Sequence, residues 1–308
     1  MRQNIFEFCP GLCPCSALGG SLACLFFLFY GVAFLAELCR IRHDGRIQRG
    51  ISFAALLAGL IPHTILIFNL SITAAPQAAT GAGQWFYVLA WGLILLEMIL
   101  FFGYPKTPFG AFLLPAVFVA VFAGSALADT RFREAGHLFG TLHGLSLLMA
   151  TVFLLYGFII GIMYFLQRAK IRSRKGFLRG IPLPSLEWLQ KSNRVSAYLS
   201  LFFLGLGIFF GLLMRRAADA DGQVQSGDLM VWGGIALFLL MAVSLLFLSR
   251  SDPGRKDGRT ALLCVISFLI LIVILGYGSL ASEAHWLFTQ SDEPAAGPLT
   301  DHDKESAR

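Results

Sequence analysis

Three histidines are placed where an imidazole has a reason to bind a metal. His143 lies inside the long apolar run GTLHGLSLLMATVFLLYGFIIGIMYFL, His63 lies inside GLIPHTILIF, and His285 follows the last apolar run. An ionisable side chain in an apolar span is costly, so it lines a cavity, pairs with a polar group or binds a metal. Two neutral imidazoles are a common axial ligand set for haem iron. Hydrogen-bonded packing is the alternative for each histidine.

A carboxylate and a cysteine cluster are the other groups with chemical potential. Glu97 lies within YVLAWGLILLEMILFF, where it is either a proton relay, a partner for a cation, or a protonated packing residue. Glu37 is expected to reach the membrane surface. Cys9, Cys13 and Cys15 form FCPGLCPCS, whose spacing is not that of a standard zinc, iron–sulfur or haem-attachment motif. The alternatives for this cluster are a disulfide, thiol exchange or metal binding.

Apolar runs along the chain provide the helices that position these groups. The 308 residues are 56% hydrophobic and only 14% charged, against about 25% charged in soluble domains. Eight runs are long enough to cross a hydrocarbon core about 30 Å thick. The sequence therefore predicts an all-α, polytopic integral membrane protein with about eight transmembrane helices, near 17–38, 51–70, 85–103, 108–127, 138–166, 196–214, 229–249 and 260–282.

The positive charges predict that both termini lie outside. In that orientation the inner loops are 40–50, 104–107, 167–195 and 250–259, and they hold 4, 1, 8 and 4 of the 24 Lys and Arg residues. Positive residues concentrate on the inner side of membrane proteins. The net charge of +6 is thus a topology signal that calls for no nucleic-acid partner. The predicted location is a bacterial-type inner (plasma) membrane, with multiple passes.

The same topology collects histidines on the outer side. His63 is expected roughly 10 Å, and His143 roughly 8 Å, below the outer boundary at 1.5 Å of rise per residue. His137 and His285 lie at that surface. Whether the helices that carry His63 and His143 are neighbours is not determined by the sequence.

Two features are interpreted as architecture. Pro182 and Pro184 precede a short amphipathic stretch that is expected to form an interfacial helix before the sixth span. Small residues recur four apart along the spans, which allows helices to approach closely in lipid. These pairs are Gly140 and Gly144, Gly157 and Gly161, and Gly207 and Gly211.

Several segments, taken in order, carry a family resemblance. They are WFYVLAW, PFGAFLLPAVFVAVFA, LHGLSLLMATVFLLYG with Gly157 fourteen residues beyond His143, NRVSAYLSLFFLGLGIFFG, and GYGSLASEAH with His285 nine residues after Gly276. Together, over roughly residues 50 to 286, they resemble the cytochrome c assembly membrane family, the CcsA/HemX-type proteins. Members of that family handle haem at the membrane.

The resemblance implies a set of haem-binding residues. His143 and His285 match the family's outward-facing pair and are expected to ligate iron of a non-covalent haem b. His63 resembles a second-span histidine of the HemX-like branch and is an alternative or second ligand. Asp228 and Trp232 match remnants of the family's Trp-rich outer loop.

Two departures from the family narrow the expected function. The other tryptophans of the outer loop are absent, and Leu246 stands where the family has a further, inner histidine. The expectation is therefore a haem-binding factor in c-type cytochrome biogenesis that is not an enzyme and does not translocate haem unaided. The implied partners are a second membrane protein with a large outer domain and apocytochrome c. Haem propionates are expected to meet arginines among Arg131, Arg133, Arg215 and Arg216.

Two other function classes are kept as alternatives. One is a membrane regulator of tetrapyrrole synthesis that acts through its cytoplasmic loops, chiefly 167–195. The other is a proton-coupled secondary transporter that uses Glu97 and His63. The predicted domain organisation is an outer Cys-containing segment at 1–16, an eight-helix cytochrome c assembly-like membrane domain at 17–286, and a polar, disordered outer tail at 287–308.

Overall fold

Helices account for nearly all of the described chain. The computed structural model describes residues 20–42, 45–73, 82–126, 138–172, 182–219, 229–250 and 258–275. The predicted outer segments 1–16 and 287–308 lie outside these ranges. The helices are α1 (Gly20–Arg42), α2 (Arg46–Thr73), α3 (Ala82–Gly103), α4 (Gly110–Ala126), α5 (Leu138–Arg172), α6 (Leu186–Asp219) and α7 (Leu229–Arg250), followed by a helix over Gly258–Leu275, called the last helix below.

The all-α, multi-pass membrane class is confirmed. Each predicted apolar run overlaps one of these helices. In the described ranges, seven helices are long and apolar enough to cross a membrane, and α4, with 17 residues, is a shorter apolar helix. The number of crossings and the orientation of the termini stay predictions.

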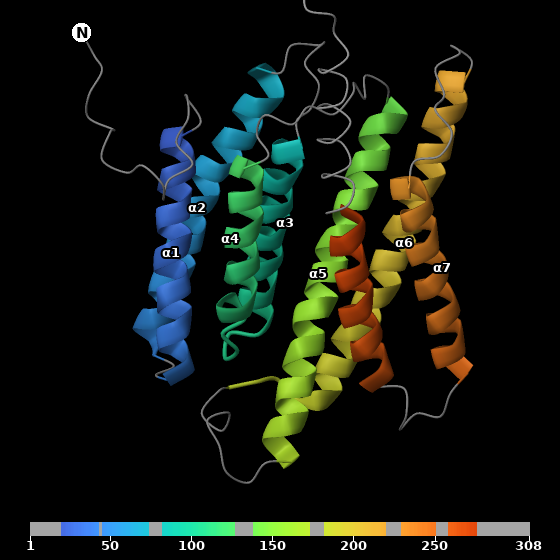
Figure 1. The fold of residues 1–308 in the computed structure, drawn as a ribbon. Helices are drawn as coiled ribbons and strands as arrows, with labels where there is room; N and C mark the ends of the chain where they lie inside the picture. Colours follow the sequence, from blue (N-terminus) through green and yellow to red (C-terminus); the bar gives the residue numbers. More distant parts are fainter. Residues whose placement is uncertain are drawn as a thin grey trace, which may run out of the picture.

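Successive helices run in alternating directions (Figure 1). The helices α1, α5 and α7 all finish at the same end of the bundle, and each has arginine or lysine in its last turn. We call this the basic end, and the other the opposite end. The basic residues of these last turns are Arg40, Arg42, Lys170, Arg172 and Arg250.

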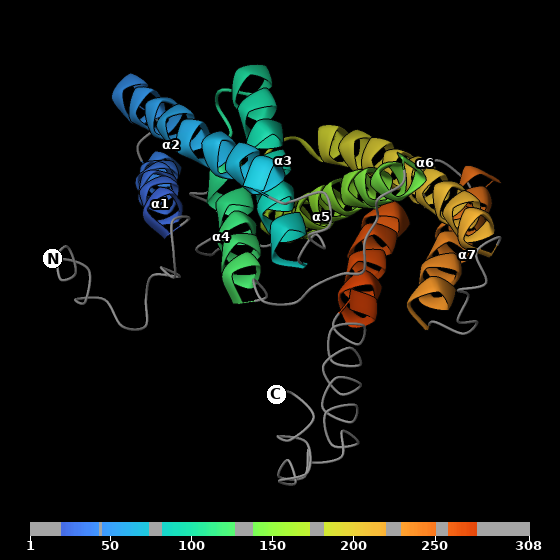
Figure 2. The same cartoon turned by 90° about the horizontal axis from the view of Figure 1, so that it is seen from above.

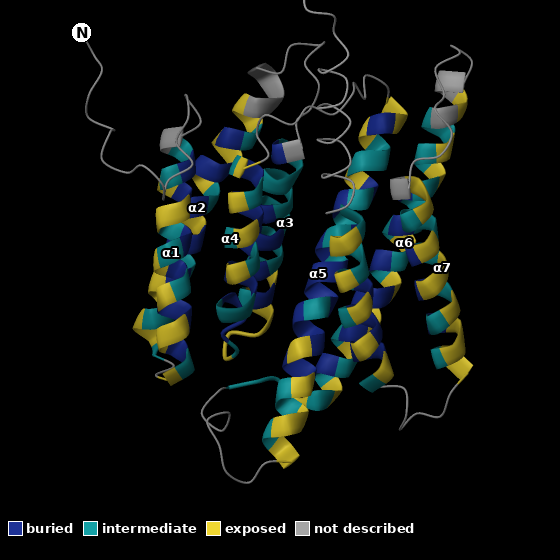
Figure 3. Ribbon diagram, in the orientation of Figure 1, coloured by how far each residue is buried: buried dark blue, intermediate teal, exposed yellow. Residues whose placement is uncertain are grey.

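The helices form two groups that lie side by side (Figures 1 and 2). The first group is α1–α4, and the second is α5, α6, α7 and the last helix. Contacts are most extensive within the α1–α2, α3–α4 and α5–α6 pairs, while α3 and α4 also contact α5. One apolar core fills the first group and extends to α5, to Leu189 of α6 and to Ala261 of the last helix, and a smaller one joins α5, α6, α7 and the last helix. Aliphatic side chains on the outer faces remain exposed, as expected for contact with lipid (Figure 3).

The helix α6 is longer than the sequence pattern indicates. Its first turn is capped by Ser185, whose hydroxyl accepts from the backbone N–H of Trp188 at 3.3 Å, as serine does at helix N-termini. No proline or glycine occurs after Ser185 until Gly205, so the helix continues without a break into the span. The prediction of a separate interfacial helix after Pro182 and Pro184 is therefore wrong.

Trp188 connects the two groups at the basic end. Its ring centroid lies 4.6 Å from that of Tyr104 and 5.4 Å from that of Phe109, both on the connection between α3 and α4. Such aromatic pairs add to the stabilisation that burial provides. The start of α6 is thereby fixed against the first group.

Glycines allow the last helix to approach α5. A Cβ atom on Gly161 would lie 3.0 Å from the carbonyl oxygen of Ala261, and one on Gly157 would lie 3.2 Å from Cys264 Sγ. Both distances are shorter than ordinary van der Waals contact between carbon and these atoms. The packing role predicted for this glycine pair is confirmed.

Candidate functional site

His143 lies near the start of α5, at the opposite end of the bundle. Its Nδ1 is 2.7 Å from the carbonyl oxygen of Gly207 on α6. A carbonyl only accepts, so Nδ1 carries the proton and donates it. Nε2 then keeps its lone pair, which is the form of imidazole that coordinates metals.

The ring of His143 is seated on a surface made by glycine. A Cβ atom on Gly211 would lie 2.9 Å from Nδ1 and 3.0 Å from Cε1 of the imidazole. A larger residue at this position would therefore collide with the ring. Gly207 and Gly211, which the sequence indicates as packing residues, thus also hold His143 against α6.

An aromatic ring that the sequence pattern did not single out lies one residue from His143. A side chain on Gly144 would collide with the indole of Trp85 on α3. The sequence contains an indication of this contact, because Gly144, directly after His143, leaves room for a large side chain from a neighbouring helix. Trp85 therefore packs against α5 one residue away from His143.

The proposed partners of His143 fall mostly on undescribed residues. His285 and Asp228 lie outside the described ranges. Trp232, near the start of α7, is 64% exposed. The last helix runs toward the opposite end (Figure 1), and Leu275, its last described residue, precedes His285 by ten positions. Ten extended residues span at most about 35 Å.

His63 has a different environment, because both of its ring nitrogens already have partners. The Tyr30 hydroxyl donates to Nδ1 at 3.1 Å, and Nε2 donates to the backbone carbonyl of Tyr87 at 3.1 Å. The ring stacks on Phe26 with centroids 4.3 Å apart, and the residue is fully buried. A metal could bind His63 only if one of these hydrogen bonds broke. His63 packs within the first group and His143 at the α5–α6 contact, so the two are not brought together.

A buried charged cluster lies near the basic end of the first group. Glu37 Oε1 accepts from Arg40 Nη1 and from Ser52 Oγ, each at 2.5 Å. Arg40 Nη2 donates to the backbone carbonyl of Pro105 at 2.6 Å. Its guanidinium lies 5.4 Å from the ring centroid of Phe101, close enough for a cation–π interaction.

Two members of this cluster lie elsewhere than the sequence predicts. Glu37, which was expected at the surface, is 0% exposed, and Arg40, which was assigned to an inner loop, is 2% exposed within α1. The helix continues to Arg42 and carries both side chains into contact with α2 and the α3–α4 connection. The surface prediction for Glu37 is wrong because its partners come from segments distant in sequence.

Glu97 extends the cluster from α3. It is 1% exposed, and its carboxylate accepts from the backbone N–H of Gly110, the first residue of α4. A helix N-terminus has N–H groups without partners and a partial positive charge, so a carboxylate is stabilised there. A Cβ atom on Gly110 would lie 3.0 Å from Glu97 Oε1 and 3.3 Å from Glu37 Cδ. Both carboxyl groups therefore meet at this glycine.

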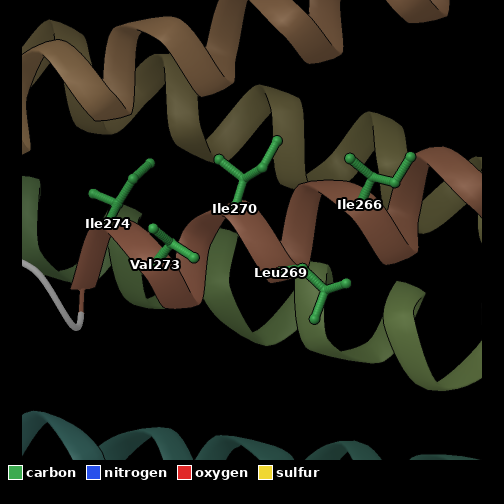
Figure 4. Close-up of a pocket in the computed structure, with 5 residues that line it drawn as sticks. All are labelled: Ile266, Leu269, Ile270, Val273 and Ile274. Atoms are coloured by element: carbon green, nitrogen blue, oxygen red, sulfur yellow. The ribbon is translucent and has the colours of Figure 1, made fainter.

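Other features of the described residues offer less chemistry. Within the described ranges there is no group of three or more His, Cys, Asp or Glu side chains placed to hold a metal ion. A shallow hollow on the last helix is lined by the aliphatic side chains of Ile266, Leu269, Ile270, Val273 and Ile274 (Figure 4). Such a surface suits lipid tails and has no group that reacts or binds a polar ligand.

Comparison with known protein families, with curated proteins and with solved structures finds no match to this chain. A functional proposal therefore rests on the residues described above and on the sequence segments that carry the family resemblance.

Proposed function

We propose that this chain is a haem-binding membrane factor of c-type cytochrome biogenesis. His143 and His285 would together hold the iron of a haem b at the opposite end, which is the outer side in the proposed topology. The observation that carries the proposal is the hydrogen bond from His143 Nδ1 to the Gly207 carbonyl, because it leaves Nε2 available for iron.

The environment of His143 supports a haem site. Histidines that bind metals almost always donate their other ring N–H to a carbonyl or carboxylate, which fixes the ring and the tautomer. His143 has this arrangement, and the glycine surface of α6 holds the ring in place. A porphyrin supplies four nitrogen ligands itself, so two imidazoles complete the iron coordination. When bound, the haem would supply the redox-active iron.

Other residues near the opposite end have supporting roles. Trp85 and the exposed Trp232 offer aromatic faces for the porphyrin. Arg216, exposed near the end of α6, can donate charge-assisted hydrogen bonds to a haem propionate. Asp228, in the remnant of the Trp-rich loop, belongs to the same proposed site.

The proposal has one haem site and no relay through the membrane. At the position of the family's inner histidine stands Leu246, which is 53% exposed on α7 and cannot bind iron. The chain is therefore proposed to bind and present haem without catalysing a reaction. Its proposed partners are a second membrane protein with a large outer domain and apocytochrome c, at a bacterial-type inner membrane.

The test is the absorption spectrum of the detergent-purified full chain, oxidised and reduced, beside His143→Ala and His285→Ala. We expect a Soret band in the wild type, and its loss or a ligand-dependent shift in each variant. His302→Ala in the tail is the matched control and should leave the spectrum unchanged. A Soret band that neither ligand substitution alters overturns the ligand pair.

The spectrum also separates the proposal from its alternatives. If the chain contains no haem even when haem is supplied during expression, the haem function is overturned. A regulator of tetrapyrrole synthesis would then be identified by dependence on the 167–195 segment. The transporter alternative is favoured by one specific observation, namely the buried charged cluster of Glu37, Arg40 and Glu97.

A further inference from the structure

The charged cluster has an imbalance of charge. Two carboxyl groups, Glu37 and Glu97, share one guanidinium, Arg40, and all three side chains are at most 2% exposed. If both carboxyl groups were ionised, the side chains of the cluster that the structure describes would carry one uncompensated negative charge away from water. Burial of an unpaired charge costs several kcal/mol, so such a group binds a counter-charge or becomes neutral.

Two oxygen atoms of the cluster are available for that counter-charge. Glu37 Oε2 and Glu97 Oε2 are buried, and neither has a hydrogen-bond partner among the described residues. The hydrogen bonds described for these carboxyl groups involve other atoms: Arg40 and Ser52 donate to Glu37 Oε1, and the Gly110 amide donates to the Glu97 carboxylate. Buried polar atoms in native proteins normally have partners.

The described neighbours of Glu97 come from three other helices, α1, α2 and α4. The charged side chains that act on it are Glu37 and Arg40, both from α1. The helix α4 contributes the amide of Gly110, and α2 contributes the hydroxyl of Ser52 through Glu37. The absence of a side chain at Gly110 lets the two carboxyl groups approach the same point.

We infer that Glu37 and Glu97 form a carboxyl pair that binds one exchangeable proton, with Arg40 compensating the remaining negative charge. A proton is favoured over a metal ion because the described protein ligands are few. A Ca²⁺ or Mg²⁺ ion takes six or more oxygen ligands, whereas one proton neutralises the pair and converts one unpartnered oxygen into a donor. Two like carboxyl groups that share a site commonly bind a single proton.

The position of the pair indicates where the proton exchanges. Glu97 precedes the end of α3 by six residues, or about 9 Å along the helix, at the basic end. Arg40 is bound to the carbonyl of Pro105, and that connection is exposed at Tyr104, Pro105 and Lys106. We therefore expect the proton of the pair to exchange with water at the basic end. His143 lies at the opposite end, and the proton site does not depend on the haem proposal.

The test is infrared difference spectroscopy of the detergent-purified full chain at neutral pH in sodium-free buffer. The carbonyl stretch of a protonated carboxylic acid is compared between wild type, Glu37→Gln and Glu97→Gln. Either substitution leaves one carboxylate, whose charge the Arg40 guanidinium balances, so the cluster no longer needs a proton. We therefore expect each substitution alone to abolish the carboxylic acid signal of the pair. Glu187→Gln, which changes an exposed carboxylate on α6, is the matched control and should leave it intact.

Arg40→Gln provides the opposite change, since removal of the guanidinium should let the pair bind a second proton and about double the signal. If this variant does not fold, the two glutamine variants still decide the question. A signal that survives in both of them overturns the inference. Loss of the wild-type signal when sodium is added would also overturn it, in favour of a sodium site.

Discussion

The two helix groups bury their polar side chains in different ways. Among the described residues of the first group, most buried polar side chains are ionisable: Glu37, Arg40 and Glu97 form a cluster with the neutral Ser52, and His63 has partners on both nitrogens. In the second group the buried polar residues are neutral, namely Asn193, Ser196, Ser200, Thr260 and Ser267 beside Ser146. There the ionisable side chain of interest, His143, lies at the α5–α6 contact with one nitrogen bound.

This difference separates an imidazole that stabilises the fold from one that is available to bind a ligand. A fully partnered imidazole such as His63 stabilises the fold but has nothing left to offer a ligand. A half-partnered imidazole such as His143 is already oriented and can still bind. A histidine in an apolar helix is therefore not by itself a sign of a ligand site. It can bind a ligand only if its second ring nitrogen has no hydrogen-bond partner.

Arg40→Gln should have the largest effect on stability. The substitution removes the cation from a buried ion pair and leaves two carboxyl groups together, a type of change that costs about 3–5 kcal/mol. Thermal unfolding in detergent, followed by circular dichroism, measures it. Arg216→Gln, which changes an exposed arginine of the second group, should change stability by less than about 0.5 kcal/mol. Equal losses would mean that the buried cluster does not stabilise the first group.

His63→Ala and His143→Ala test the contrast between the histidines directly. The first leaves the Tyr30 hydroxyl and the Tyr87 carbonyl without a partner and opens a cavity beside Phe26, for a loss of about 2–4 kcal/mol. The second removes one hydrogen bond at a partly exposed position, for about 1 kcal/mol. The same thermal unfolding measurement ranks them. If His63→Ala kept its stability and lost haem, the roles of the two histidines would be reversed.

The sequence predicted the helices better than their contacts. Hydropathy located each helix, because an apolar run of span length has few other structures available to it. It missed that α1 carries Glu37 and Arg40 into the protein, since the partners Ser52 and Pro105 belong to segments that become neighbours only in the fold. It also divided α6, because two prolines indicate where a helix cannot continue but not how long the next helix is.

For the candidate site, too, the sequence predicted the residues better than their contacts. His143 could be selected from its position in an apolar run, and the glycine pairs could be recognised as packing surfaces. That Gly211 lies under the imidazole, and that Gly207 binds it, depends on how α5 and α6 are rotated against each other. A periodicity in one helix does not determine that rotation.

Gly211→Ala should have the smallest effect on stability and a selective effect on the site. The new Cβ atom would lie 2.9 Å from His143 Nδ1, so the ring must tilt and lengthen its 2.7 Å hydrogen bond to Gly207. A ligand misplaced by a fraction of an ångström binds its metal more weakly, and losses of about 10-fold or more in affinity are typical when such support is removed. Haem titration of the purified variant measures this.

Gly234→Ala on α7 is the matched control, because a Cβ atom there meets nothing within 4 Å. Alanine is the better helix former by about 1 kcal/mol, so this variant should be as stable as the wild type or more stable, with unchanged haem affinity. A Gly211→Ala variant that binds haem as tightly as Gly234→Ala would show that the imidazole does not need the glycine surface. His143 would then differ from His63 only in having one ring nitrogen without a described partner.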